Sequence, residues 1–171
     1  MSAPTVVGSG SVSRDRALGF PWGTLELGGA PVAHLGRFSM LNTFFGRGQR
    51  VRLPSGDAWR VKAVSWHRFV CPVVVDRSGA GLATSAPAHE SYAMNAPRLG
   101  LEMHPAEGRA GRPRRWVLVH HDEEIGRLRR HPFEVELSEP LPLPVVLLGF
   151  SLATFGVLGE KDLVTKAASW G

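Results

Sequence analysis

One uncharged stretch decides the fold: it runs from Leu141 to Gly159 and reads LPLPVVLLGFSLATFGVLG. Pro144 suits the first turn of a helix, where its missing N–H would have no partner in any case. The sequence therefore predicts a helix over residues 144–158, about 22 Å long at about 1.5 Å per residue. Apolar side chains cover every face of this helix, and a helix of that kind is either buried in protein or lies in lipid.

The length of the segment favours burial in protein. A bilayer core is about 30 Å thick and needs about 20 residues of helix, so residues 144–158 are too short to cross it comfortably. The alternative is a small tail-anchored membrane protein, with residues 141–159 in lipid. Gly149, Ala153 and Gly156 form a stripe of small side chains that would let another backbone approach the helix in either environment.

The chain before this helix repeats one pattern. Two short runs rich in β-branched residues flank a turn with Gly, Pro, Asp or Ser, which is the signal of a β-hairpin. The pattern occurs at residues 24–35, 50–64, 69–84 and 116–128. Residues 133–137 alternate as a further strand, whereas residues 104–115 read as one long polar loop. About ten or more such strands tend to close on themselves, because closure removes exposed edges.

Length and composition limit the class of protein. The chain has 171 residues with 43% hydrophobic residues, which suits one domain with a core and excludes wholesale disorder. Its 20 Gly and 13 Pro argue against a helix bundle, and its single cysteine excludes an intrachain disulfide framework. We expect a flexible lead over residues 1–20, a mainly β, closed antiparallel barrel of about a dozen short strands over residues 21–160, and a tail over residues 161–171. The first residues contain no apolar run of a secretory signal, so we expect a cytoplasmic protein that contacts the inner face of the membrane peripherally.

Many short strands followed by one apolar C-terminal helix resemble the tubby-like barrel superfamily, which includes the phospholipid scramblases and the LURP-one-related proteins and has bacterial members. The turns at residues 53–57, 75–79 and 120–126 carry the resemblance, together with the strand at 133–137 that leads into residues 141–152. The resemblance implies a barrel threaded by its helix, no enzymatic activity, and phosphoinositide tethering or lipid handling in some relatives. The cysteine-rich segment and the acidic calcium loop of scramblases are missing here, which argues against scramblase activity.

The strongest candidate site is a group of arginines on both sides of the predicted turn at Asp122. The hairpin register brings Arg114 and Arg115 opposite the second arginine run at the hairpin base. Like charges held together favour an anionic partner, and guanidinium groups fit phosphate. We call this group the hairpin arginines. They are Arg109, Arg112, Arg114, Arg115, Arg127, Arg129 and Arg130.

The function expected from these residues is a non-enzymatic binding module for anionic phosphate groups, with phospholipid headgroups at a membrane surface as the partner. A nucleic-acid-binding barrel that uses the same arginines is an alternative, and so is a solvated basic surface without a partner. Neither a cofactor nor a metal is expected, because consecutive side chains in residues 120–124 point to opposite faces of a strand and no distant ligand completes a site. Cys71 is expected to be buried and unreactive. No nucleophile or acid–base pair indicates an enzyme.

Overall fold

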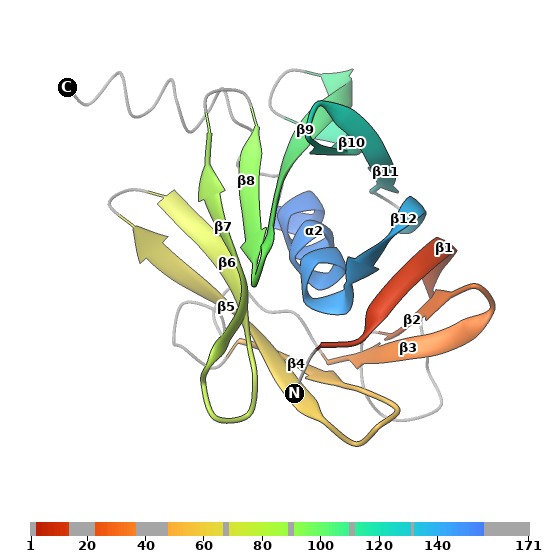
Figure 1. The fold of residues 1–171 in the computed structure, drawn as a ribbon, viewed down its shortest axis with the longest axis vertical. Coiled ribbons are helices and arrows are strands. Elements are labelled where there is room, and N and C mark those ends of the chain that lie inside the picture. Colours follow the sequence, from red (N-terminus) through yellow and green to blue (C-terminus); the bar gives the residue numbers. More distant parts are fainter. Residues whose placement is uncertain are drawn as a thin grey trace.

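The structure, a computed structural model, describes residues 3–13, 23–36, 48–66, 69–88, 91–109, 112–130 and 132–155. In this part of the chain, antiparallel strands β1 to β12 close into a barrel around one helix, α2 (Leu143–Phe155) (Figure 1). The strands are β1 (Thr5–Ser13), β2 (Gly23–Leu27), β3 (Ala30–Leu35), β4 (Gln49–Arg52), β5 (Ala58–Trp66), β6 (Phe69–Val75), β7 (Gly81–Pro87), β8 (Tyr92–Ala96), β9 (Leu99–Arg109), β10 (Arg112–His120), β11 (Glu123–Arg129) and β12 (Glu134–Pro142). The predicted fold class is confirmed.

Helix α2 fills the centre of the barrel. Residues 145–148 cover a full turn of the helix and are at most 1% exposed, because strands β5–β8 and β10–β12 surround them. At Gly149 an added Cβ would stand 2.7 Å from Leu128 Cδ1, so the glycine lets the helix approach β11 closely. The buried-helix prediction is confirmed, with a start at Leu143 instead of residue 144. Its predicted last residues, 156–158, lie outside the described residues. None of the helices described here has the length and apolar character needed to cross a membrane.

The four predicted hairpins form as β2–β3, β4–β5, β6–β7 and β10–β11. Each of their turns contains a residue with positive φ, and in two of the turns both central residues have it. Gly28 and Gly29 have φ of 59° and 78°, and His121 and Asp122 have φ of 50° and 65°. Positive φ at both central residues is typical of the type I′ turn, whose twist matches that of the flanking strands. Asp and His tolerate this region better than most residues do.

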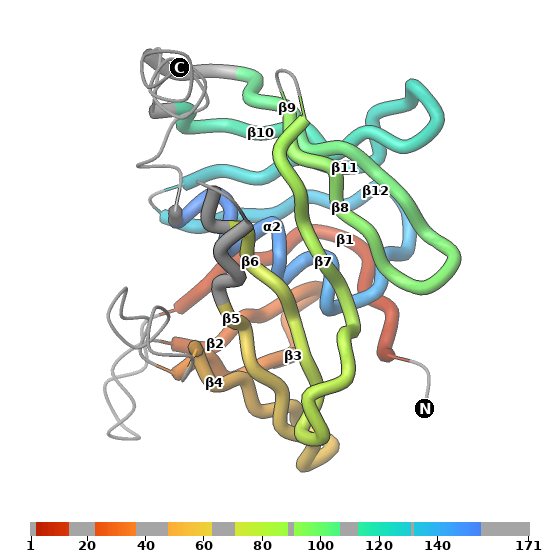
Figure 2. The backbone as a smooth tube through the Cα atoms, turned by 90° about the vertical axis from the view of Figure 1, so that its left-hand side faces the viewer, coloured from red at the N-terminus to blue at the C-terminus, as the bar shows by residue number. Residues whose placement is uncertain are grey.

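The expectation of a flexible lead over residues 1–20 is wrong for residues 5–13. These residues form β1, which closes the barrel between β12 and β2 (Figure 2). Val6 and Val12 are partly buried against the core. Gly10 lies so close to β2 that an added Cβ would stand 2.0 Å from the Glu26 carbonyl oxygen. Exposure alternates along β1, but the sequence does not reveal this strand, because glycine and serine have low strand preference. The expected tail over residues 161–171 lies outside the described residues.

The expectation of a polar loop over residues 104–115 is also wrong. Strands β9 and β10 run through most of it and pair with each other up to Arg109 and Arg112. The prolines that suggested a loop, Pro105 and Pro113, lie beside irregularities in the ladder, where its register shifts around Arg115. Bulges of this kind accommodate residues that have no N–H to donate. The hairpin arginines are therefore strand residues, except Arg130, which directly follows β11.

Candidate functional site

The register of β10 and β11 sets the arrangement of the hairpin arginines. Arg115 pairs with Arg129, and the Arg130 N–H donates to the Arg114 carbonyl oxygen at 2.9 Å. The structure therefore brings the two arginine runs together at the hairpin base, as the sequence predicts. Arg109 and Arg112 pair through their backbones where β9 and β10 meet, and their side chains lie outside the described part of the structure.

Several of these side chains reach solvent. Arg127 and Arg129 are exposed at period two on the outer face of β11. Arg114 and Arg115 are both exposed although they are neighbours in one strand. The register between β9 and β10 shifts on both sides of Arg115, and such a shift re-aims the side chains of the bulged strand.

Glutamates interleave with the arginines on this outer face. The Arg127 Nε–H donates to Glu124, and this hydrogen bond raises the pKa of Arg127. Arg129 Nη1 lies 3.1 Å from Glu134 Oε2, and Glu136 is the register partner of Arg127. Opposite charges thus lie side by side on the adjacent strands β11 and β12. The sequence shows that residues 134 and 136 share a face, but their position beside β11 depends on the strand order.

A groove of about 710 Å³ crosses this part of the surface. Its lining includes three guanidinium groups and three carboxylate groups. They belong to Arg115, Arg127, Arg129, Glu124, Glu134 and Glu136. We call it the charged groove. Because the formal charges of these six groups cancel, a simple anion meets both attraction and repulsion there, which the sequence alone did not predict.

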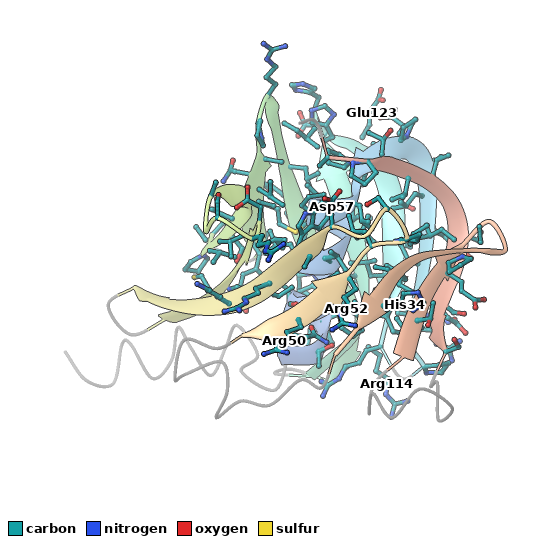
Figure 3. All side chains as sticks on the ribbon, turned by 90° about the horizontal axis from the view of Figure 1, so that it is seen from below. His34, Arg50, Arg52, Asp57, Arg114 and Glu123 are labelled. Carbon is teal, nitrogen blue, oxygen red and sulfur yellow. The ribbon has the colours of Figure 1, made fainter. Side chains whose placement is uncertain are left out.

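A second surface carries basic side chains on the outer side of β3, β4 and β5. Register places Arg50 opposite Arg60. It also places His34 opposite Arg52, and Figure 3 shows these two residues and Arg50 on the same side of the barrel. The three arginines are exposed and the lysine of the group is half-buried. His34 Nδ1 lies 3.0 Å from the Thr24 hydroxyl oxygen. We call this surface the basic face; it consists of His34, Arg50, Arg52, Arg60 and Lys62.

Part of the basic face has no counter-charge among the residues that the structure describes. Within the described part of the chain, Arg50, Arg60 and Lys62 form no ion pair with a carboxylate. Sequence reasoning missed this surface, although Arg50 and Arg52 in one strand and Arg60 and Lys62 in the next are both spaced at period two. Each pair alone looks like an ordinary strand surface. The cluster appears only when the register of the β4–β5 hairpin is applied.

Other polar side chains that could carry chemistry have structural partners. The Ser85 hydroxyl donates to the Pro72 carbonyl oxygen at 2.8 Å, and His104 Nε2 lies 2.7 Å from Glu102 Oε2. Burial raises the pKa of the Cys71 thiol, as expected for an unreactive cysteine. Among the residues that the structure describes, no group of three or more His, Cys, Asp or Glu side chains could hold a metal ion.

Comparison with known proteins gives no match to a family model, a curated protein or a solved structure. The resemblance to tubby-like barrels therefore rests on the order of the elements and on the turns quoted above. Any functional conclusion has to come from the chemistry of the two charged surfaces.

Proposed function

We propose that this chain is a non-enzymatic binding module that holds anionic phosphate groups on its basic face, with phospholipid headgroups at a membrane surface as the partner. One observation carries the proposal. The basic face gathers three arginines and one lysine on the adjacent strands β4 and β5, and Arg50, Arg60 and Lys62 have no ion-pair partner among the described residues.

The repulsion between these cations supports an anionic partner. Side chains directly opposite each other in an antiparallel pair are about 4.5–5.5 Å apart, and like charges at that distance destabilise the sheet. This applies to Arg50 and Arg60, which are direct register partners. An anion placed between two guanidinium groups removes the repulsion, and their planar N–H donors match the oxygens of phosphate in pairs.

The shape of the surface supports a layer of headgroups as the partner. Outward residues along a strand are about 6.6–6.8 Å apart, and neighbouring strands are about 4.8 Å apart. The basic face is therefore a two-dimensional array of cations on a sheet, which can meet several phosphates of a membrane at once. Each Lys or Arg held near an anionic membrane contributes about 1 kcal/mol to binding. The charged groove is less suitable, because its carboxylates repel phosphate.

Vesicle flotation of the full chain tests the proposal. Phosphatidylcholine vesicles that contain phosphatidylserine should carry the protein at low salt, and binding should fade as salt screens the charges over about 8–10 Å. Arg50→Glu/Arg60→Glu should bind about 30-fold more weakly, equivalent to about 2 kcal/mol. The matched control is Arg77→Glu/Arg98→Glu, which reverses two exposed arginines outside the basic face. It has the same net charge and should keep most of the binding.

Other outcomes would change the conclusion. Equal weakening by both double variants would mean that net charge, and not the basic face, controls binding. A third variant, Arg114→Glu/Arg115→Glu, tests the hairpin arginines; we expect a smaller loss than for the basic face, because carboxylates already neutralise their surroundings. A mobility-shift assay with duplex DNA runs in parallel. Binding to DNA without binding to vesicles would replace the membrane partner with nucleic acid.

A further inference from the structure

We infer that the charged groove binds a small zwitterion, a molecule with an oxyanion at one end and an ammonium group at the other. The groove lies on β9 to β12, on strands different from those of the basic face. The inference therefore goes beyond the proposed function and does not depend on it. It rests on the order of the charges in the groove, on the partners they already have, and on the volume between them.

The charges in the groove change sign between β11 and β12. One row across the sheet runs from Arg115 on β10 to Arg129 on β11 and Glu134 on β12. The next row places Arg127 on β11 opposite Glu136 on β12. In these two rows the β10–β11 side is therefore positive and the β12 side is negative, so the rows form a fixed dipole across the strands. Glu124, which also lines the groove from β11, is paired with Arg127.

The internal ion pairs leave binding capacity at both ends of this dipole. Arg127 uses Nε for Glu124, and Arg129 uses Nη1 for Glu134. A guanidinium group has five N–H donors, so each arginine retains donors for a ligand oxyanion. Glu136 forms no ion pair within the described part of the chain and can accept an ammonium group.

A zwitterion fits this arrangement better than a simple ion does. An anion attracted by the arginines is repelled by the glutamates of the next strand, and the reverse holds for a cation. A molecule aligned with the dipole gains attraction at both ends, which is the condition of electrostatic complementarity. The groove also has apolar lining from Ala106 and Val117, against which an alkyl chain between the two charged ends can pack.

The dimensions define the ligand further. The volume of about 710 Å³ lies within the range of small-molecule sites, about 300–1,000 Å³. Strands β10 and β12 are two strand spacings apart, about 10 Å, and adjacent strands are about 5 Å apart. The two charged groups of the ligand should therefore be separated by about 5–10 Å, as in an ω-amino acid with a flexible chain of several carbons.

Three probes with one carbon skeleton test this inference by calorimetric titration of the full chain. The zwitterion 6-aminohexanoate should bind saturably in the millimolar range, because partly exposed ion pairs are weak. Hexanoate, which has only the anionic group, and hexylamine, which has only the cationic group, should each bind at least tenfold more weakly. Raised salt should weaken binding of the zwitterion.

Two glutamates of β12 provide a test variant and its matched control. Glu136→Gln removes the carboxylate proposed for the ammonium group and should weaken 6-aminohexanoate at least tenfold, to the level of hexanoate. Glu139→Gln changes another exposed glutamate of β12 that does not line the groove and should bind like the wild type. Equal binding of hexanoate and 6-aminohexanoate, or no effect of Glu136→Gln, would overturn the inference. Neither result affects the proposed function, because that is tested with different residues and with vesicles.

Discussion

Replacing Leu148 with alanine tests whether α2 is the core of the barrel. Leu148 is fully buried in the middle of the helix. The substitution removes apolar surface from the core and leaves a cavity, which for buried leucines costs about 2–5 kcal/mol. A loss of about 3 kcal/mol is a large part of the about 5–15 kcal/mol that stabilises a typical domain. For a chain of this length it corresponds to a fall in melting temperature of about 6–12 °C.

Thermal melting followed by circular dichroism in detergent-free buffer measures this change. Val7→Ala is the control, because Val7 is 50% exposed on β1 and its truncation should change stability by about 0.5 kcal/mol or less. The stronger substitution Leu148→Asp places an unpaired carboxylate in the core and should prevent folding. If Leu148→Ala and Val7→Ala melted at the same temperature, and Leu148→Asp kept the wild-type spectrum, the helix would not be the core.

Three further predictions concern backbone contacts and a buried thiol. Gly10→Ala should destabilise the barrel by about 1–3 kcal/mol in thermal melts, because the new Cβ would stand 2.0 Å from the Glu26 carbonyl oxygen and separate β1 from β2. Replacing His121-Asp122 with Asn-Gly should raise the melting temperature by about 2–4 °C, because glycine adopts positive φ without the cost of about 1 kcal/mol that Asp122 has there. Burial raises the pKa of the Cys71 thiol above its usual value, so its contribution to stability is complete below the unfolded-state pKa and is lost as pH rises through the folded-state pKa. Cys71→Ala should therefore flatten the alkaline decline of the melting temperature.

Each of these predictions has a result that contradicts it. A wild-type melting temperature for Gly10→Ala would mean that β1 does not pair closely with β2. The control is Ser11→Ala in the same strand, which should melt like the wild type. A lower melting temperature for the Asn-Gly turn would show that His121 and Asp122 make stabilising contacts that outweigh their backbone cost. An unchanged alkaline limb in Cys71→Ala would assign the pH dependence to other groups.

The parts of the fold that the sequence predicts are those determined by neighbouring residues. A turn such as Gly28-Gly29 supplies positive φ within a few residues of both strands that it joins, and the apolar surface of α2 is visible in one continuous segment. Strand β1 could not be predicted in this way, because its partner β12 lies at the opposite end of the described chain. Its small side chains carry almost no strand preference of their own.

The charged surfaces, like the fold, are predictable from sequence only where neighbouring residues determine them. The sequence indicates that Arg115 and Arg129 meet, since one turn fixes their register. The position of Glu134 beside Arg129 requires the next strand in the barrel, and that strand order is not encoded in the turn. The cluster around Arg50 and Arg60 is missed for a different reason. Each short pair of cations looks like an ordinary exposed strand surface, and the cluster appears only when the register of the two strands is known.

The place of α2 in chain order has a consequence for biosynthesis. The helix follows β1 to β12 in the chain, although it occupies the centre that all of them enclose. Ribosomes add about 5–20 residues per second, so roughly 7–28 s separate the synthesis of β1 from that of α2. During this interval Leu25, Val51 and Val74, which are fully buried in the finished barrel, have no helix to cover them. Nascent chains therefore expose these apolar side chains to chaperones and proteases, and the barrel can acquire its core only when translation of the helix is complete.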